Sequence, residues 1–185
     1  MCAYKPSRVE FLLDPLLERT LGRGRIARFI EYTRLKGDER IMDFGSGPGV
    51  MSMAIATRLE KGGGRLTCLD VTEGWMRIAK KRLGKMPNVD FIFGDIRGKS
   101  IPEGSYDGIV INYVIHDIDK PDRKPIVEAL ARALAKGGRI YIREPVLRGH
   151  GMPPEELRGL MRDSGLEETR FELTKPRLTA TYTKK

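Results

Sequence analysis

The sequence predicts an α/β protein with a doubly wound, mostly parallel seven-stranded sheet that ends in a C-terminal antiparallel hairpin. Two observations support this prediction. Strand-like and helix-like patterns alternate along the chain, which is typical of a parallel sheet flanked by helices. Within the run 107–114, residues 108–111 are apolar without interruption, as expected for a parallel strand that is buried on both faces.

The first part of the chain contributes three of the strands. Apolar runs bounded by turn residues predict strands over 40–44, 65–70 and 89–93. Helical spacing of apolar side chains predicts helices over 25–35, 49–60 and 73–83, each followed closely by glycine. A further helical pattern over 8–21 is interrupted by Pro15, and we expect residues 1–24 to form a cover over the ligand cleft.

The second part contributes the remaining strands. We expect strands over 107–114, 139–144, 168–174 and 177–183, and helices over 122–135 and 154–164. The last two strands are close enough to pair as a hairpin, although Pro176 requires a wide turn or an edge position. Because no linker, repeat or low-complexity stretch interrupts the pattern, residues 25–185 are predicted to form a single domain.

A glycine-rich turn follows the first expected strand. Gly45, Gly47 and Gly49 let the backbone turn tightly and approach a ligand closely, and Pro48 suits the first turn of the next helix. Asp70, at the end of the second strand, can accept hydrogen bonds from both hydroxyls of a ribose. This order of elements makes half of a nucleoside-binding fold.

The turn also indicates which nucleoside it binds. A dinucleotide site would need a glycine where Val50 stands, and the Gly-Lys-Ser/Thr ending of a triphosphate loop is absent. Asp43, just before the turn, favours a cationic ligand by Coulomb attraction. S-adenosylmethionine has a ribose, an adenine, a sulfonium and an ammonium group, and it has no phosphate.

At these residues the sequence resembles the class I (Rossmann-like) S-adenosylmethionine-dependent methyltransferases. Their first motif, an acid followed by alternating glycines, is matched by Asp43, Gly45, Gly47 and Gly49, and the resemblance covers roughly residues 24–185. It implies the class I methyltransferase fold, S-adenosylmethionine as cofactor and methyl transfer as the reaction. The cofactor-binding residues that it implies are Asp43, Gly45, Ser46, Gly47, Gly49, Asp70, Val71, Trp75, Asp95, Ile96 and Asn112.

Several of these residues have an ordinary structural alternative. Asp70 could cap the following helix, and Trp75 could pack in the core instead of on the adenine. The resemblance implies that Asp95 accepts from the adenine amino group and that the backbone of Ile96 meets the ring, whereas Asp95 could also be a turn residue. Asn112 is expected to face the methionine end of the cofactor.

His116, one of only two histidines, lies just past the fourth expected strand and could act as a general base. Glu144 ends the fifth strand, and both strands open onto the same edge of the sheet. Glu144 could therefore orient a protonated His116, although the sequence does not establish their contact. This segment is similar to the one in plant-type small-molecule O-methyltransferases, in which an acid orients a histidine base. A capping or packing role for His116 is the alternative.

The acceptor is predicted to be a small molecule, because Asn112 is not followed by the Pro-Pro-Tyr of enzymes that methylate base or amide nitrogens. The formal net charge of +9 means that this molecule could be anionic. Methylation of RNA or a protein is the first alternative, and a non-catalytic S-adenosylmethionine-binding protein is the second. A nicotinamide dehydrogenase is disfavoured by Val50.

The sequence also suggests what the protein does not contain. No His, Cys or Asp cluster has the spacing of metal ligands, so no metal is expected. No apolar run approaches the ~20 residues that span a bilayer, and the N-terminus has no apolar signal region. Cys2 and Cys68 do not indicate a disulfide framework. We therefore predict a cytoplasmic protein, and the sequence leaves its oligomeric state open.

Overall fold

A computed structural model describes residues 23–147 and 149–185. These residues form two compact units, one within Ala3–Gly94 and one comprising Asp95–Lys185, which we call the first and the second unit. The helix expected over 8–21 and nearly all of the expected cover segment lie outside the described residues. The proposal of a single domain over 25–185 stays a prediction.

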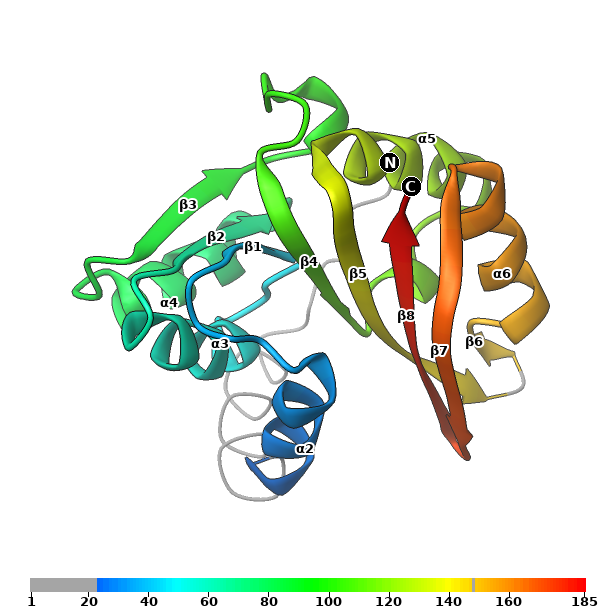
Figure 1. The fold of residues 1–185 in the computed structure, drawn as a ribbon, viewed down its shortest axis with the longest axis horizontal. Helices are drawn as coiled ribbons and strands as arrows, with labels where there is room; N and C mark the ends of the chain where they lie inside the picture. Colours follow the sequence, from blue (N-terminus) through cyan, green and yellow to red (C-terminus); the bar gives the residue numbers. More distant parts are fainter. Residues whose placement is uncertain (1–22, 148) are drawn as a thin grey trace. The chain divides into compact units, whose positions relative to one another are not determined.

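The first unit contains a parallel sheet in the strand order β3-β2-β1 (Figure 1). Its strands are β1 (Arg40–Phe44), β2 (Arg65–Asp70) and β3 (Val89–Phe93), as predicted. Its helices are α2 (Arg23–Thr33), α3 (Val50–Glu60) and α4 (Glu73–Leu83). The helix predicted over 25–35 is therefore shifted by two residues towards the N-terminus.

The helices of the first unit are held by apolar faces that match their sequence periodicity. Helix α4 buries Trp75, Met76, Ala79 and Leu83 and leaves Arg77, Lys80 and Lys81 exposed. Where α3 begins, it lies so close to α4 that a Cβ on Gly49 would stand 2.8 Å from a Leu83 methyl carbon. This close contact fixes the end of the glycine-rich turn against α4.

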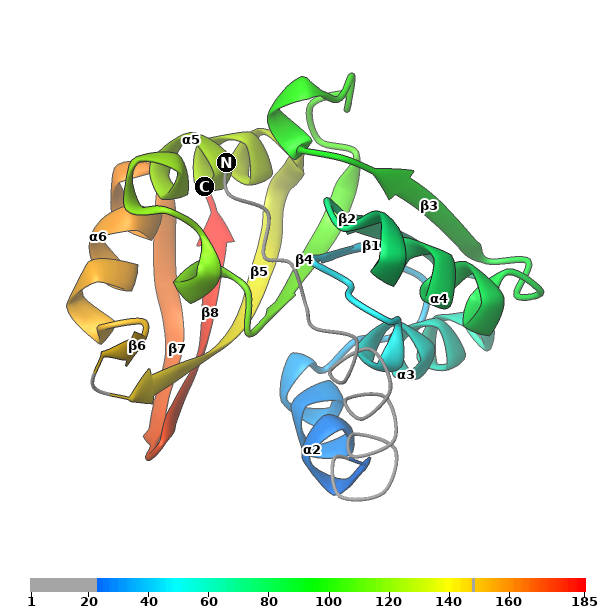
Figure 2. The ribbon, with the colours of Figure 1, turned by 180° about the vertical axis from the view of Figure 1, so that it is seen from behind.

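The second unit contains a mixed sheet in the order β4-β5-β8-β7. Strands β4 (Tyr106–Asn112) and β5 (Leu134–Leu147) are parallel, whereas β8 (Arg177–Lys184) pairs antiparallel with both β5 and β7 (Leu166–Thr174). A two-residue strand, β6 (His150–Gly151), pairs with β5. Helices α5 (Lys120–Ala133) and α6 (Pro154–Asp163) cover one face of this sheet (Figure 2).

Three details of the second unit differ from the predictions. Strand β5 begins at Leu134 instead of 139, because Leu134 already pairs with Tyr106 of β4. The hairpin closes through Lys175 and a cis Pro176 alone, so of the two expected alternatives the wide turn does not form, and Pro176 directly follows β7, the edge strand of this sheet. Between β3 and β4, where no helix is predicted, the chain forms a short 3₁₀ helix, η1 (Ile96–Gly98).

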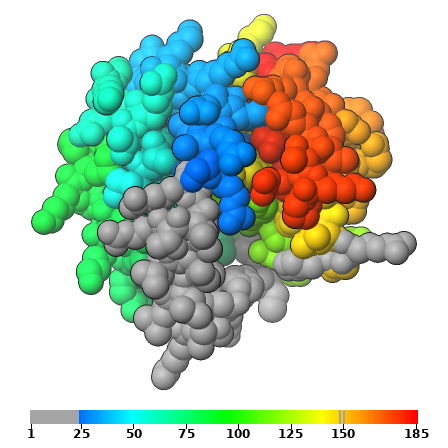
Figure 3. Space-filling view, turned by 90° about the horizontal axis from the view of Figure 1, so that it is seen from below, coloured from blue at the N-terminus to red at the C-terminus, as the bar shows by residue number. Residues whose placement is uncertain are grey.

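The predicted fold class is confirmed. Seven strands of ordinary length are mostly parallel, and the chain ends in an antiparallel hairpin. The tip of this hairpin is exposed in the space-filling view (Figure 3), and Leu173 near it is 49% exposed. Within residues 23–147 and 149–185, no helix is long and apolar enough to cross a membrane.

Candidate active site

The glycine-rich turn of the first unit has the backbone conformation that its sequence predicts. Gly45, Gly47 and Gly49 have φ values of 70°, 52° and 78°, in the left-handed region that favours glycine. The Gly45 N–H donates to the Leu69 carbonyl at 2.8 Å, which ties the end of β1 to β2. A Cβ on Gly47 would meet nothing within 4 Å, whereas Gly49 packs against α4. Gly47 is therefore the glycine that borders open space.

Asp70 is joined to this turn through its carboxylate. One oxygen accepts from the Gly47 N–H at 2.7 Å and the other from the Thr72 N–H at 2.7 Å. Burial raises the pKa of Asp70, and the hydrogen bonds from Thr72 and Gly47 partly oppose this rise. Thr72 is the N-cap residue of α4, so the bond from its N–H to Asp70 ties the carboxylate to the start of this helix. A carboxylate has about four acceptor positions, which leaves room for ribose hydroxyls.

Asp43 and Ser46 lie on either side of the same strand end. Asp43 is 1% exposed and accepts from the Ser52 hydroxyl of α3 at 2.6 Å. Cys68 is nearby, and burial, followed by the charge of Asp43, raises its pKa to about 12. The Ser46 hydroxyl oxygen is buried and has no hydrogen-bond partner among the described residues. An unsatisfied buried hydroxyl calls for a polar ligand or a water.

The other predicted residues of the first unit are partly or fully buried. Val71 is half-buried directly after Asp70. Trp75 is 7% exposed and belongs to the buried face of α4. The orphaned Ser46 hydroxyl and the open space beside Gly47 fit a polar ligand with hydroxyl groups, such as the ribose of a nucleoside.

Asp95 and Ile96 begin the second unit. The guanidinium of Arg97 donates to Oδ1 of Asp95 at 3.2 Å and to Oδ2 at 3.0 and 2.6 Å, and this hydrogen bonding lowers the pKa of Asp95 despite some burial. Arg97 also pairs with Asp122 in the first turn of α5. Ile96 is 4% exposed. The acid that the resemblance assigns to adenine is thus held in place by an arginine.

His116 and Glu144 are in contact. Nδ1 of His116 lies 2.6 Å from Oε2 of Glu144, whose side chain is fully buried. The other oxygen of Glu144 accepts from the N–H groups of Val114 and Ile115, at 3.0 and 2.8 Å. One carboxylate therefore orients both the imidazole and the backbone that carries it, a contact that the sequence could not establish.

The electrostatic environment favours the protonated form of His116. Burial lowers its pKa, but the hydrogen bond to Glu144 and the charges of Glu144 and Asp117 outweigh this effect, so the pKa is raised above its ordinary value. The nearby Arg123 opposes the rise. An imidazole that gains and releases a proton in this setting can act as an acid or a base.

Arg123 fixes the turn that carries His116. Its guanidinium donates to the carbonyls of His116 and Ile118, at 2.9 and 2.8 Å, and it forms an ion pair with Glu156 of α6. Arg123 is 7% exposed. Helices α5 and α6 are therefore both linked to the candidate base through one buried cation.

A third arginine lies where β4 ends. Arg143 of β5 donates to the side-chain oxygen of Asn112 at 2.7 Å, and its guanidinium lies 5.1 Å from the centre of the Tyr113 ring. Tyr113 has a φ of 59°, which is unfavourable for a residue other than glycine. Such conformations occur often at functional sites.

The sequence interpretation missed Arg97, Arg123 and Arg143. A usable signal existed for Arg143. It directly follows the apolar run Ile140–Ile142, where a charged residue breaks the pattern of a buried strand. Arg97 and Arg123 gave no such signal, because arginine is common on exposed loops and helices. Only their ion pairs in the folded chain distinguish them.

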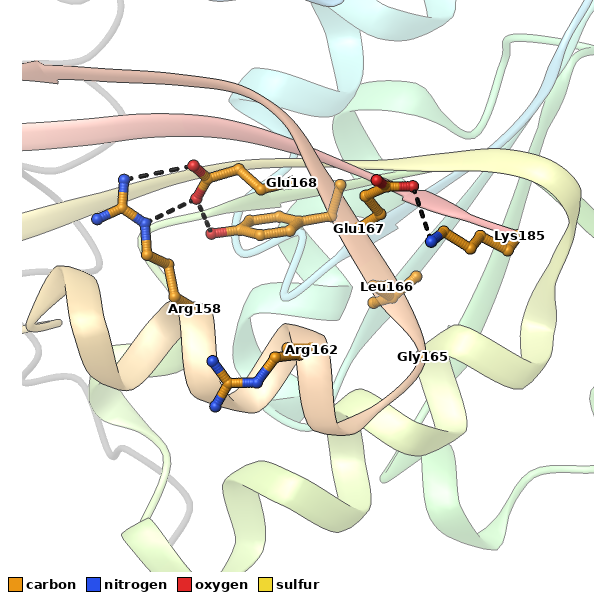
Figure 4. A pocket seen from close by; sticks show the side chains of 8 residues that line it. Arg158, Arg162, Gly165, Leu166, Glu167, Glu168 and Lys185 are labelled. Carbon is orange, nitrogen blue, oxygen red and sulfur yellow. Dashed lines mark hydrogen bonds and ion pairs between the residues drawn. The ribbon is translucent and has the colours of Figure 1, made fainter.

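A separate pocket of about 450 Å³ lies between α6 and the hairpin of the second unit (Figure 4). The pocket borders the end of the hairpin at which Leu166 of β7 pairs with Lys184 of β8. Glu144 pairs with Leu178, at the other end of β8, so the pocket is separate from the contact between His116 and Glu144. Its cations are matched by acids, since Arg158 pairs with Glu168 and Lys185 with Glu167. This pocket does not include any of the predicted site residues.

Comparison with known proteins places these features in a family. A family model described as a methyltransferase domain matches residues 41–138, which include the glycine-rich turn, Asp70, Asp95 and His116. The chain belongs to this methyltransferase family. This membership confirms the family that the sequence resembles, and it supports S-adenosylmethionine as the cofactor.

Curated relatives of this methyltransferase differ in their acceptors. A demethylmenaquinone methyltransferase from Clavibacter sepedonicus is 32% identical over 106 residues, which cover 57% of this chain and 41% of the relative. A ribosomal RNA small subunit methyltransferase A from Thermotoga petrophila is 29% identical over 110 residues, covering 58% and 40% of the two chains. The alignments thus span about two fifths of the length of these relatives.

Solved structures show the same fold. A SAM-dependent methyltransferase from Aquifex aeolicus superposes with a TM-score of 0.72 at 20% identity, covering 85% of this chain and 88% of that one. The N-methyltransferase NodS from Bradyrhizobium japonicum, solved with S-adenosyl-L-homocysteine, superposes with a TM-score of 0.73 at 19% identity, covering 88% and 86%. At these identities the likeness concerns the fold.

Proposed function

We propose that this methyltransferase transfers a methyl group from S-adenosylmethionine to a small-molecule acceptor and that His116 is the base. The contact between His116 and the buried Glu144 carries the proposal, since a carboxylate at 2.6 Å orients the imidazole and favours its protonated form.

The residues at the strand ends are proposed to hold the cofactor. Asp70 would accept from the ribose, Ser46 and Gly47 would border it, and Asp95 with Ile96 would meet the adenine. The remaining proposed contacts are Asp43, Gly45, Gly49, Val71, Trp75 and Asn112. When bound, S-adenosylmethionine supplies an electrophilic methyl group on a positively charged sulfur.

The protein then has to orient the acceptor and manage one proton. For a hydroxyl acceptor, His116 would take the hydroxyl proton through Nε2, the ring nitrogen that does not contact Glu144 and that lies 3.4 Å from an oxygen of Asp117. Glu144 stabilises the imidazolium that results, and the proton later leaves to water. A base at this position would fit transfer to an acceptor oxygen.

The type of acceptor is supported by the curated relatives. Several are named demethylmenaquinone methyltransferases, and a quinol-type acceptor offers an O–H or an activated carbon of small size. RNA methylation is the second candidate, because the Thermotoga petrophila relative acts on ribosomal RNA and the first unit carries an excess of positive charge.

Two measurements test the proposal. Calorimetric titration with S-adenosylhomocysteine, with NAD as control, should give micromolar binding of the first alone, and this binding should be lost in Asp70→Ala. Transfer from radiolabelled S-adenosylmethionine to quinol, phenol and catechol acceptors should follow and fall at least 100-fold in His116→Ala. Binding without transfer to any acceptor, RNA or protein would instead indicate a non-catalytic binding protein.

A further inference from the structure

A cationic stripe lies on the exposed side of α4 in the first unit. We define it as Arg77, Lys80 and Lys81 of the helix and Lys85 just after its end, all of which are exposed. Residues at intervals of three and four share one helix face, so these side chains stand on one side. The opposite side buries Trp75, Met76, Ala79 and Leu83.

The stripe is not neutralised by the described part of the chain. None of its four side chains forms an ion pair or hydrogen bond with a described residue. No acidic residue occurs from Gly74 to Val89, and the flanking Asp90 pairs with Arg65. Residues 23–94 hold 14 Lys and Arg against 8 Asp and Glu, so the first unit carries most of the net charge of +9.

The cations of the second unit are arranged differently. Five of them pair with carboxylates: Lys124 with Glu128, Arg158 with Glu168, Arg170 with Glu172, Lys184 with Glu103 and Lys185 with Glu167. Its exposed cations without an ion pair to a described residue, such as Lys99, Lys120 and Lys136, belong to different elements and do not form a row. The helix dipole explains cations in the last turn of α4, but its effect fades beyond that turn and does not account for Arg77. The dipole therefore accounts for Lys80 and Lys81 but not for Arg77 or Lys85, and none of the four is neutralised by a described carboxylate.

From this contrast we propose that the stripe binds the phosphate backbone of double-stranded RNA. Protein-binding surfaces have an apolar or aromatic centre and few charges, whereas nucleic-acid interfaces are polar and strongly positive. The stripe has no aromatic side chain on which the bases of a single strand could stack. It also lacks Asn and Gln to read base edges, which fits a duplex recognised through its shape and phosphates.

The inference does not depend on the acceptor of the proposed methyl transfer. Residues along one helix face rise by about 6 Å for every four positions, so the stripe presents a regular row of positive charges. Each neutralised phosphate releases counterions and makes binding weaker as salt increases. Four contacts give a slope of about −3.6 for the logarithm of affinity against the logarithm of salt concentration.

The test is fluorescence anisotropy of a labelled 20-base-pair RNA duplex with the full chain, between 50 and 200 mM salt. Lys80→Gln with Lys81→Gln should weaken binding at least tenfold at 100 mM salt and reduce the slope by about 1.8. The control double variant, Lys124→Gln with Lys136→Gln, removes the same charge from exposed positions of the second unit and should leave the slope within about 0.5.

The competing outcomes are distinct. Equal losses in both double variants would show that only net charge matters, and they would overturn the proposal. Equal or tighter binding of the same duplex in DNA, or displacement of RNA by an acidic peptide at lower concentration, would assign the stripe to another partner. Calorimetry with S-adenosylhomocysteine should be unchanged in all variants, so loss of RNA binding remains separable from failure of the proposed methyl transfer.

Discussion

The two units build their candidate sites in different ways. The site of the first unit is made mostly of backbone: a turn of three left-handed glycines and an acid that accepts from Gly47 and Thr72. The site of the second unit is made of side chains, since Glu144 reaches back 28 residues to His116. The site of the first unit should therefore be sensitive to substitutions that change the backbone conformation. The site of the second unit should instead be sensitive to the loss of single functional groups.

The largest effect is expected where one group serves several partners. Replacing Glu144 by Ala removes the acceptor of Val114, Ile115 and His116 at a fully buried position. The free energy of unfolding should fall by about 3–5 kcal/mol, measured by urea denaturation. Glu144→Gln retains an acceptor oxygen for the two N–H groups and should lose only about 1 kcal/mol.

The exposed Glu128→Ala is the matched control for Glu144→Ala. Its carboxylate is half exposed, and its only described ion pair, to Lys124, is 4.0 Å long. It should change stability by no more than about 0.5 kcal/mol. A Glu144→Ala variant as stable as this control would mean that the buried carboxylate does not hold the turn.

Next in size is the effect of removing the charge of Asp70. Asp70→Asn keeps the shape of the side chain but replaces one acceptor oxygen by a donor, so the affinity for S-adenosylhomocysteine should fall roughly 10–100-fold. Calorimetry measures this change directly. Asp90→Asn, on the exposed side of β3, is the control and should bind normally. Unchanged affinity in Asp70→Asn would remove Asp70 from the proposed site.

The difference between the units also explains how far the sequence could predict them. The glycine-rich turn and Asp70 were predictable because their spacing is local and each left-handed position requires glycine. Most strands and helices were predictable for the same reason, since their periodicity is local. The hairpin turn at Pro176 was not, because both a wide turn and a cis proline are compatible with its sequence.

The side-chain site was predictable only in part. His116 and Glu144 could be placed at neighbouring strand ends, but their contact depends on the register in which Asn112 faces Arg143. The ion pairs of Arg97 and Arg123 depend on residues about 25 and 33 positions away, and no local pattern encodes such pairs. Long-range side-chain contacts therefore marked the limit of prediction.

Within the first unit, alanine substitutions of Gly49 and Gly47 should separate the effect of the turn on stability from its effect on ligand binding. Gly49→Ala should destabilise the protein by about 2–4 kcal/mol, because its Cβ would lie 2.8 Å from Leu83 in a left-handed residue. Gly47→Ala should cost only about 1 kcal/mol of stability, since its Cβ meets nothing, but should weaken S-adenosylhomocysteine binding at least tenfold. Normal binding by Gly47→Ala would show that the ligand does not occupy this open space.

The smallest effect concerns the proton on His116. Its folded pKa is raised because the hydrogen bond and charge of Glu144 outweigh burial, so it should titrate above 6.5 by NMR of its imidazole ring. Because the pKa of His116 is higher in the folded than in the unfolded protein, its protonation stabilises the fold at pH values below the unfolded pKa. This stabilisation is lost as the pH rises through the folded pKa, and it amounts to about 1.4 kcal/mol for each unit by which the two pKa values differ. The methyl-transfer rate should rise over the same pH range, as His116 becomes an available base.

Glu144→Gln separates this proton effect from the structural one. Without the carboxylate charge, burial prevails and the pKa of His116 should fall below that of the wild type, so the pH dependence of stability and transfer should shift together to lower pH. His150→Gln identifies the His116 signal, because the chain has only two histidines. If His116 titrates identically in wild type and Glu144→Gln, the carboxylate shapes the turn but does not tune the base, and the second unit would then resemble the first in serving mainly through its backbone.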